Sequence, residues 1–143
     1  MASQTVVLDT NIVLDLFVFA EKAARPLRSR LEDGELRWLV TAAMRDELER
    51  VLAYPQIVAR LALYRLVAAD VLGIFDRHSV RVDVPAKAPV TCKDPDDQKF
   101  VDLAVANRAI LLSKDRAVLA LTKRLELLAV HVGACLRTDM THL

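Results

Sequence analysis

Glycine, cysteine and long apolar runs are all scarce in this chain, and each scarcity excludes a class of protein. Three glycines among 143 residues are too few for a glycine-rich phosphate loop. The two cysteines are far apart and outside any Cys-x-x-Cys pattern, which favours buried free thiols in a reducing compartment over a disulfide. The longest segment without a formally charged residue, 127–136, spans only ten residues. A membrane helix needs about 17–25 apolar residues, so we expect no association with a membrane.

Excess charge of either sign is also missing. Twenty Lys and Arg against nineteen Asp and Glu give a net charge of +1, which argues against a protein that holds nucleic acid by bulk electrostatics. An enzyme with an acidic pocket flanked by cations remains possible. The N-terminus has no basic start followed by a long apolar core, so we expect a cytoplasmic protein. A hydrophobic content of 54% predicts a single globular domain over residues 1–143.

Short apolar runs alternate along the chain with longer segments of helical spacing. The runs predict strands at 6–8, 36–40, 80–84 and 110–112, with a weaker candidate at 128–132. The helical segments are 11–20, 22–32, 42–54, 56–77, 96–107 and 116–127. Strands separated by helices pair in parallel through crossover connections, and their lack of polar alternation indicates burial on both faces. We therefore predict an α/β fold, a three-layer α/β/α sandwich with a central parallel sheet of four or five strands.

Local boundary signals agree with this alternation. Asp94-Pro95 places a capping carboxylate before a proline at the first helical position, which predicts a helix start. Thr41 and Ser113 stand where two further helices could begin. The segment 85–89 begins and ends with proline and predicts a loop.

The segment 57–75 carries an unusually broad apolar stripe. It includes Ile57, Leu61, Tyr64, Ala68, Leu72 and Phe75, and further apolar residues beside them widen it. One interpretation is a helix buried on two sides within the fold. The other is a surface for self-association or for a partner, which would make the protein a homo-oligomer through this helix.

Four acidic residues are expected near one edge of the sheet. Asp9 directly follows the first strand, and Asp115 lies just beyond the strand at 110–112. Asp97 falls in the first turn of the helix opened by Asp94-Pro95, and Glu47 follows the second strand on the next helix. Ligands of open parallel sheets bind beyond the carboxyl ends of the strands. Clustered carboxylates repel unless a cation sits among them, and without His or Cys ligands they suit Mg²⁺ or Mn²⁺.

Each acid also has a structural explanation. Asp94 and Asp96 can cap a helix, Asp115 can begin another, and Glu47 can lie on a solvated face with Arg50. Asp9 is harder to explain this way, because a carboxylate that ends a buried strand is costly without a partner. Composition and spacing therefore leave two alternatives open, a metal-dependent phosphoryl-type site and a set of structural acids.

Four segments resemble the motifs of PIN-domain nucleases, in the order found in that family. They are Val-Val-Leu-Asp-Thr-Asn (6–11), Arg-Asp-Glu-Leu-Glu-Arg-Val-Leu (45–52), Asp-Pro-Asp-Asp-Gln-Lys-Phe-Val-Asp-Leu-Ala (94–104) and Ile-Leu-Leu-Ser-Lys-Asp (110–115). Within the family, the chain is most similar to bacterial proteins described as toxin components of toxin–antitoxin systems. The resemblance covers residues 5–119, and the last twenty or so residues match nothing in it.

The resemblance implies a metal-dependent endoribonuclease that hydrolyses RNA phosphodiester bonds and is neutralised by an antitoxin protein. The residues matching the catalytic, metal-binding acids are Asp9, Glu47, Asp97 and Asp115, with Mg²⁺ or Mn²⁺ as the cofactor. Asn11 and Ser113 match polar residues that orient a carboxylate or the attacking water, and Asp94 is an auxiliary acid at the rim. Asp97 is preferred to Asp96 because Phe100 and Ala104 then follow at the family spacing.

Two positions depart from the family pattern. Ser113 replaces the usual threonine and keeps its hydroxyl. Ala117 stands where a further acid is usual, which leaves open the alternative of a non-catalytic interaction module with a PIN fold. A haloacid-dehalogenase-like phosphatase is disfavoured because it needs an acid where Asn11 stands. The cations expected near the site, and therefore candidates for RNA contact, are Arg45, Lys93, Lys99, Lys114 and Arg116.

Overall fold

A five-stranded parallel sheet forms the centre of the molecule in a computed structural model that describes residues 4–136. The strands are β1 (Gln4–Leu8), β2 (Leu36–Val40), β3 (Ser79–Arg81), β4 (Ile110–Leu112) and β5 (Val132–Gly133). Their order across the sheet is β3-β2-β1-β4-β5, and every neighbouring pair is parallel. The α/β fold class and the five-stranded parallel sheet are confirmed.

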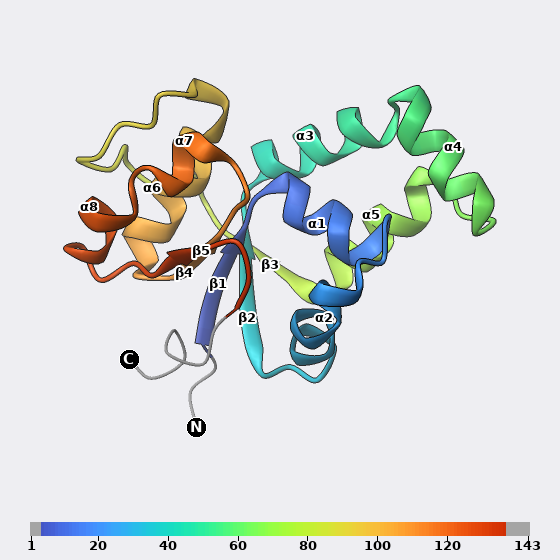
Figure 1. Ribbon diagram of the computed structural model, residues 1–143, viewed down its shortest axis with the longest axis horizontal. Helices are drawn as coiled ribbons and strands as arrows, with labels where there is room; N and C mark the ends of the chain where they lie inside the picture. The colour runs from blue at the N-terminus through green and yellow to red at the C-terminus, as the bar shows by residue number, and fades with distance from the viewer. Residues whose placement is uncertain (1–3, 137–143) are drawn as a thin grey trace.

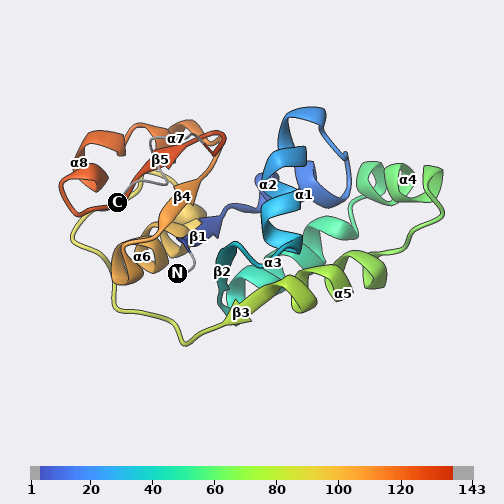
Figure 2. The same ribbon diagram turned by 90° about the horizontal axis from the view of Figure 1, so that it is seen from below.

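Helices cover both faces of this sheet, as Figures 1 and 2 show. The helices are α1 (Thr10–Phe17), α2 (Arg25–Glu32), α3 (Ala42–Leu52), α4 (Pro55–Leu63), α5 (Ala68–His78), α6 (Gln98–Asn107), α7 (Arg116–Leu119) and α8 (Thr122–Glu126). Short 3-10 helices, η1 (Lys22–Ala24) and η2 (Pro95–Asp97), precede α2 and α6. The helices α1, α2, α3 and α5 lie on one side of the sheet, whereas α6 and α8 lie on the other. The chain thus builds the predicted three layers.

Burial explains why the strands show no alternation. Val6 and Val7 in β1 and all of β4 are 0% exposed, because each strand packs against helices on both faces. Trp38 of β2 is fully buried and contacts the rings of Phe17 and Phe75, so it joins α1 and α5 to the sheet. Within residues 4–136 every helix is too short or too polar to span a bilayer.

The predicted single helix over 56–77 is wrong. It is two helices, α4 and α5, separated at Arg65, whose φ of 58° is left-handed and cannot continue an α-helix. The Asp70 carboxylate then accepts a hydrogen bond from the Val67 N–H and begins α5 anew. Each interpretation of the stripe applies to some of its residues. Ile57, Leu61, Val71 and Phe75 are buried in the core, whereas other apolar residues of the segment are exposed.

Other boundaries differ less. The strand expected at 80–84 is Ser79–Arg81, and the weak candidate at 128–132 is reduced to Val132–Gly133. The segment 116–127 divides into α7 and α8, and α7 is capped by Asp115 rather than by Ser113. Thr41 is the residue before α3, but its side chain does not cap the helix. Both cysteines are free, as expected, but only Cys92 is buried and Cys135 is exposed.

Candidate functional site

The point where the chain reverses its direction across the sheet lies between β1 and β4. From β1 the chain continues to β2 and β3 on one side of the sheet, then crosses through α6 to β4 on the other. Neighbouring strands whose connections leave in opposite directions open a crevice at their carboxyl ends. Asp9 follows β1 and Ser113 follows β4 at this crevice, so the topology alone brings together residues 104 positions apart.

Asp9 is held in place by hydrogen bonds to both carboxylate oxygens. It is 3% exposed, and its Oδ1 accepts from the Asn11 N–H at 2.7 Å, which caps α1. Its Oδ2 accepts from the Ser113 hydroxyl at 2.5 Å. Burial raises the pKa of Asp9, whereas these hydrogen bonds and the helix N–H groups act in the opposite direction. Asn11 thus contacts Asp9 through its backbone, not through its side-chain amide.

Three further carboxylates converge beside Asp9. One oxygen each from Asp94, Asp97 and Asp115 lies within 4.8 Å of the other two. Asp94 Oδ1 accepts from the Asp96 N–H at 3.0 Å, and Asp115 Oδ1 accepts from the Ala117 N–H at 2.8 Å. The capping roles considered from the sequence are therefore present. They occupy one oxygen of each residue and do not prevent the three acids from facing one another.

The cluster is electrostatically strained in the absence of a cation. Burial, a hydrogen bond with the carboxyl of Asp115, and the charges of Asp115, Asp9 and Asp94 together raise the pKa of Asp97 to about 7. Below about pH 7 Asp97 therefore holds a proton when no cation is bound. Four acids within one another's field, one of which cannot ionise freely, form a place where positive charge is stabilised.

The donor atoms fit a hard divalent cation. Asp97 Oδ2 is a buried carboxylate oxygen with no hydrogen-bond partner, which is a costly arrangement unless another group takes that place. Around it stand carboxylate oxygens, the ligands that Mg²⁺ and Mn²⁺ prefer. Neither histidine within residues 4–136, His78 or His131, joins the cluster, so a Zn²⁺-type ligand set is not formed there.

Glu47 has a different environment from the other acids. Its Oε2 accepts from the Lys99 ammonium at 2.6 Å, and its Oε1 accepts from the Thr10 hydroxyl. Lys99 also donates to the Asp96 carbonyl oxygen. The structure thus brings Asp9, Asp94, Asp97 and Asp115 together, whereas Glu47 is held beside them by a cation of the chain itself. The sequence did not reveal these contacts, because Lys99 and Glu47 are 52 positions apart.

The loop before α6 carries a cysteine that the sequence analysis did not place near the acids. Cys92 is 4% exposed, and its burial and the charges of Asp97, Asp115 and Asp94 raise its pKa. Gln98 accepts from the Cys92 N–H at 2.6 Å and donates to the Val90 carbonyl, which fixes the loop to α6. The raised pKa favours the protonated thiol, which is a poor nucleophile.

Three of the five cations expected near RNA are paired with acids of the chain. Lys99 is held by Glu47, Lys114 Nζ lies 2.6 Å from Asp15 Oδ2, and Arg45 binds Asp76 through two nitrogens at 2.8 and 2.9 Å. Lys93 and Arg116 form no ion pair within residues 4–136. Of the five cations that the sequence placed near the site, only these two are therefore available to a ligand without breaking an ion pair within residues 4–136.

The sheet and its acidic crevice define an α/β/α protein with a cluster of carboxylates that could hold a metal ion. Residues 5–117 match the sequence pattern described as PIN domain, and the chain belongs to this family. The expected family is confirmed. No curated protein sequence matches the chain.

A solved structure has the same fold. It is described as the crystal structure of VapBC2 from Rickettsia felis bound to a DNA fragment from their promoter. The match has a TM-score of 0.60 at 14% sequence identity and covers 90% of this chain and 98% of the other. At this identity the match shows a shared fold.

Proposed function

We propose that this protein is a metal-dependent endoribonuclease that hydrolyses RNA phosphodiester bonds at the crevice between β1 and β4. The observation that carries the proposal is the convergence of Asp94, Asp97 and Asp115 beside the buried Asp9. The chain belongs to the PIN domain family. Its four motifs resemble those of PIN-domain nucleases, so family membership supports the assignment.

Asp9, Asp97 and Asp115 would hold Mg²⁺ or Mn²⁺, with Asp94 at the rim and Glu47 as the fourth acid once it is released from Lys99. Bound there, such an ion supplies a water of lowered pKa and offsets the charge that develops on the phosphate. The chain's own residues provide positioning. Ser113 and the Asn11 N–H fix both oxygens of Asp9, and helix capping fixes one oxygen each of Asp94 and Asp115.

Cleavage assays test this proposal directly. We expect wild-type protein to cut a mixed RNA pool in Mg²⁺ or Mn²⁺ and to stop in EDTA. Asp9→Asn and Asp97→Asn should each lose at least about 100-fold in rate, because each removes a carboxylate that would hold the metal ion. Asp33→Asn is the matched control, since Asp33 is an exposed acid at the end of α2. Unchanged cleavage in both site variants would refute the assignment.

We further propose that the protein is the toxin of a toxin–antitoxin pair acting in the cytoplasm. The structural neighbour, named VapBC2 and solved with promoter DNA, supports a partner protein. A cavity of about 330 Å³ beside the site gives such a partner a mostly apolar place to bind, between α1, α2 and residues 134–136. Co-purification of a protein encoded beside this chain, together with loss of its cleavage activity, is the expected result.

Self-association is a separate proposal. Val58, Leu63, Tyr64 and Val67 are 51%, 74%, 52% and 63% exposed around the α4–α5 junction. Val58 and Val67 also line a groove of about 260 Å³ between α3, α4 and α5. Exposed apolar groups of this size are typical of a protein-binding surface, and the occupant we propose is a second copy of the chain.

The pairing of Glu47 with Lys99 favours one competing function, a non-catalytic interaction module. In such a protein the fourth acid would remain neutralised by Lys99 and the cluster would have no need of a metal. Metal binding separates the two, because the module predicts no saturable binding at the acids.

A further inference from the structure

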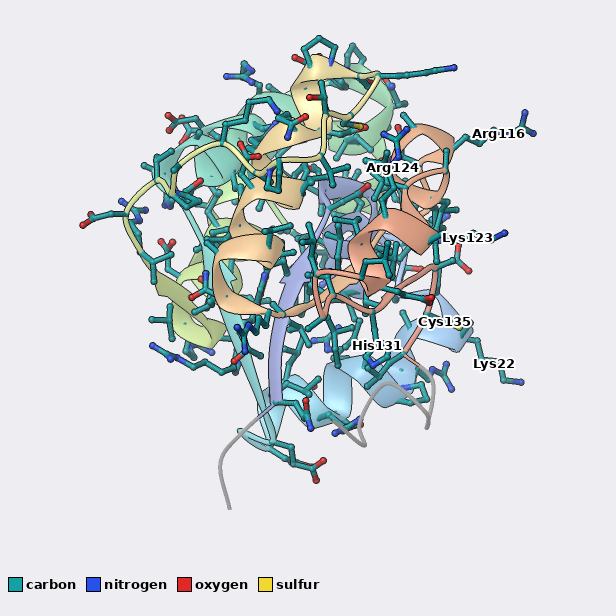
Figure 3. The ribbon with its side chains drawn as sticks, turned by 90° about the vertical axis from the view of Figure 1, so that its left-hand side faces the viewer. Lys22, Arg116, Lys123, Arg124, His131 and Cys135 are labelled. Atoms are coloured by element: carbon teal, nitrogen blue, oxygen red, sulfur yellow. The ribbon has the colours of Figure 1, made fainter. Side chains whose placement is uncertain are left out.

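Four exposed cations lie outside the acid cluster, on η1, α7 and α8. They are Lys22, Arg116, Lys123 and Arg124, and we call this set the basic face. In Figure 3, Arg116, Lys123 and Lys22 project into solvent from the same edge, and Cys135 lies between the last two. All four cationic residues and Cys135 are exposed.

The packing of α7 and α8 explains why these side chains point outward. Val118 of α7 and Leu125 of α8 are 0% exposed and face the core. Lys123 and Arg124 precede Leu125 on a short helix whose buried side is set by Leu121 and Leu125, so they occupy the solvent side. The basic face is therefore fixed by the core of the α7–α8 unit.

The charges of the basic face are not neutralised by the protein. None of its four cations makes an ion pair or a hydrogen bond with a side chain in the part of the chain that the structure describes. Lys99 and Lys114, by contrast, are each paired with an acid at 2.6 Å. An external anion can thus bind the basic face without first breaking an internal ion pair.

The basic face begins at the acid cluster. Asp115 and Arg116 are consecutive, and the cap at the start of α7 holds the Asp115 carboxylate against the Ala117 N–H, beside Asp94 and Asp97. The next side chain, Arg116, projects away from the ribbon on the outer side of α7. Arg116 is therefore the cation of the basic face that directly follows an acid of the cluster in the chain.

We propose that the basic face binds the phosphate backbone of the RNA strand that enters the acidic crevice, with Arg116 nearest the crevice and Lys123, Arg124 and Lys22 further along the strand. This inference rests on the proposed ribonuclease function and adds where the substrate lies. No aromatic side chain belongs to the face. Phe17, Trp38, Phe75 and Phe100 are buried, Phe19 is partly buried beneath Arg60, and the exposed Tyr54 and Tyr64 belong to the α4 region. Contacts to phosphate without base stacking position a strand independently of its sequence.

Binding measurements without metal test the location apart from the chemistry. A fluorescein-labelled, mixed-sequence single-stranded RNA in EDTA is the probe, so no cleavage interferes. The triple variant Arg116→Gln, Lys123→Gln, Arg124→Gln should bind at least about tenfold more weakly. The slope of log affinity against log salt should fall by about 2, because three phosphate contacts are lost.

The matched control removes the same charge elsewhere. Arg37, Arg50 and Arg77 are exposed, lie on β2, α3 and α5, and make no ion pair within residues 4–136. Their triple Gln variant should bind the RNA within about twofold of wild type. An equal loss in both triple variants would overturn the proposal, because net charge alone would then explain the binding. Wild-type RNA affinity in the Arg116→Gln, Lys123→Gln, Arg124→Gln variant would also overturn the proposal. It would do so even if this variant no longer bound an acidic partner protein.

Cys135 supplies an independent reporter of position. A photo-crosslinker attached to its exposed thiol should capture the RNA, whereas Cys135→Ser protein, which retains only the buried Cys92, should capture none. RNA that binds without crosslinking at Cys135 would contradict the proposed path. Binding and crosslinking in protein that fails to cleave in Mg²⁺ or Mn²⁺ would support the basic face and refute the ribonuclease function, so the two failures are distinguishable.

Discussion

The hydroxyl of Ser113 donates a hydrogen bond of 2.5 Å to Oδ2 of Asp9, linking the end of β4 to the end of β1. Ser113 is 0% exposed and also accepts from the Asp115 N–H at 3.0 Å. One hydroxyl therefore sets the position of two acids of the crevice. Because Asp9 is buried, its carboxylate depends on this donor and on the Asn11 N–H for stabilisation.

Removing that hydroxyl should weaken the fold as well as the site. We expect Ser113→Ala to lower the free energy of unfolding by about 1–3 kcal/mol, the cost of leaving a buried acceptor unsatisfied. Urea unfolding measures this loss. Ser113→Thr keeps the hydroxyl and is the control, with a smaller loss expected. Equal losses in the two variants would mean that packing, not the hydrogen bond, is responsible.

Stability without metal should depend on pH through Asp97. Its pKa is raised in the folded protein from the ordinary 3.8 to about 7, so between these values the folded state binds more protons than the unfolded state. Stability contributed by this group is therefore present at low pH and is lost as pH rises toward 7. Denaturant unfolding of wild type and Asp97→Asn in EDTA tests the difference.

The difference between these two proteins reports Asp97 together with the carboxylates that interact with it, because all other titrating groups are common to both. Asp97→Asn should gain stability relative to wild type as pH rises through this window. A difference that does not vary with pH would show that Asp97 keeps an ordinary pKa in the folded protein.

Divalent metal should stabilise the protein by binding the carboxylates. At 100 times its dissociation constant, Mn²⁺ or Mg²⁺ adds about 2.7 kcal/mol to the free energy of unfolding, which raises Tm by several degrees. Asp97→Asn should abolish the rise, and the exposed Asp33→Asn should retain it. A similar rise in all three proteins would indicate metal binding away from the cluster.

Lys99 should oppose metal binding by occupying Glu47. Lys99→Met removes the ammonium that lies 2.6 Å from Glu47 Oε2 and 4.8 Å from the centre of the Phe100 ring, while keeping an unbranched side chain of similar length. We expect Lys99→Met to reach half-saturation at a lower Mn²⁺ concentration in the thermal titration. In this variant Mn²⁺ does not have to displace an ammonium group from Glu47. Lys93→Met, which changes an exposed lysine of the preceding loop, is the control. Weaker metal binding by Lys99→Met would show instead that Lys99 organises the site.

Self-association through α4 and α5 should depend on the exposed apolar side chains. Leu63→Glu places a charge at a position that is 74% exposed, so the monomer fold should tolerate it while a dimer should not. Sedimentation analysis should give a dimer mass for wild type and a monomer mass for the variant. Leu127→Glu, at an 87% exposed leucine after α8, is the control and should remain dimeric.

The sequence by itself determined the layered fold and the acids that end its strands. Apolar runs such as 6–8 and 110–112 have no polar face, so they require helices on both sides. Asp9 directly follows such a run, and in a parallel sheet that position places it at the carboxyl edge. The four motifs then indicated the PIN domain family, which residues 5–117 match. These features are local in the chain, and local patterns can be read without coordinates.

Tertiary structure decided which charges are free. The break at Arg65 followed from one left-handed residue in a segment whose hydrophobic period continues through it, so periodicity alone could not locate it. The pairs Lys99–Glu47 and Lys114–Asp15 join residues far apart in sequence, and they remove two of the expected RNA contacts while leaving Arg116 exposed. Raising the pKa of Asp97 likewise required the packing of β1, α6 and β4, because burial and neighbouring carboxylates arise only when distant segments meet.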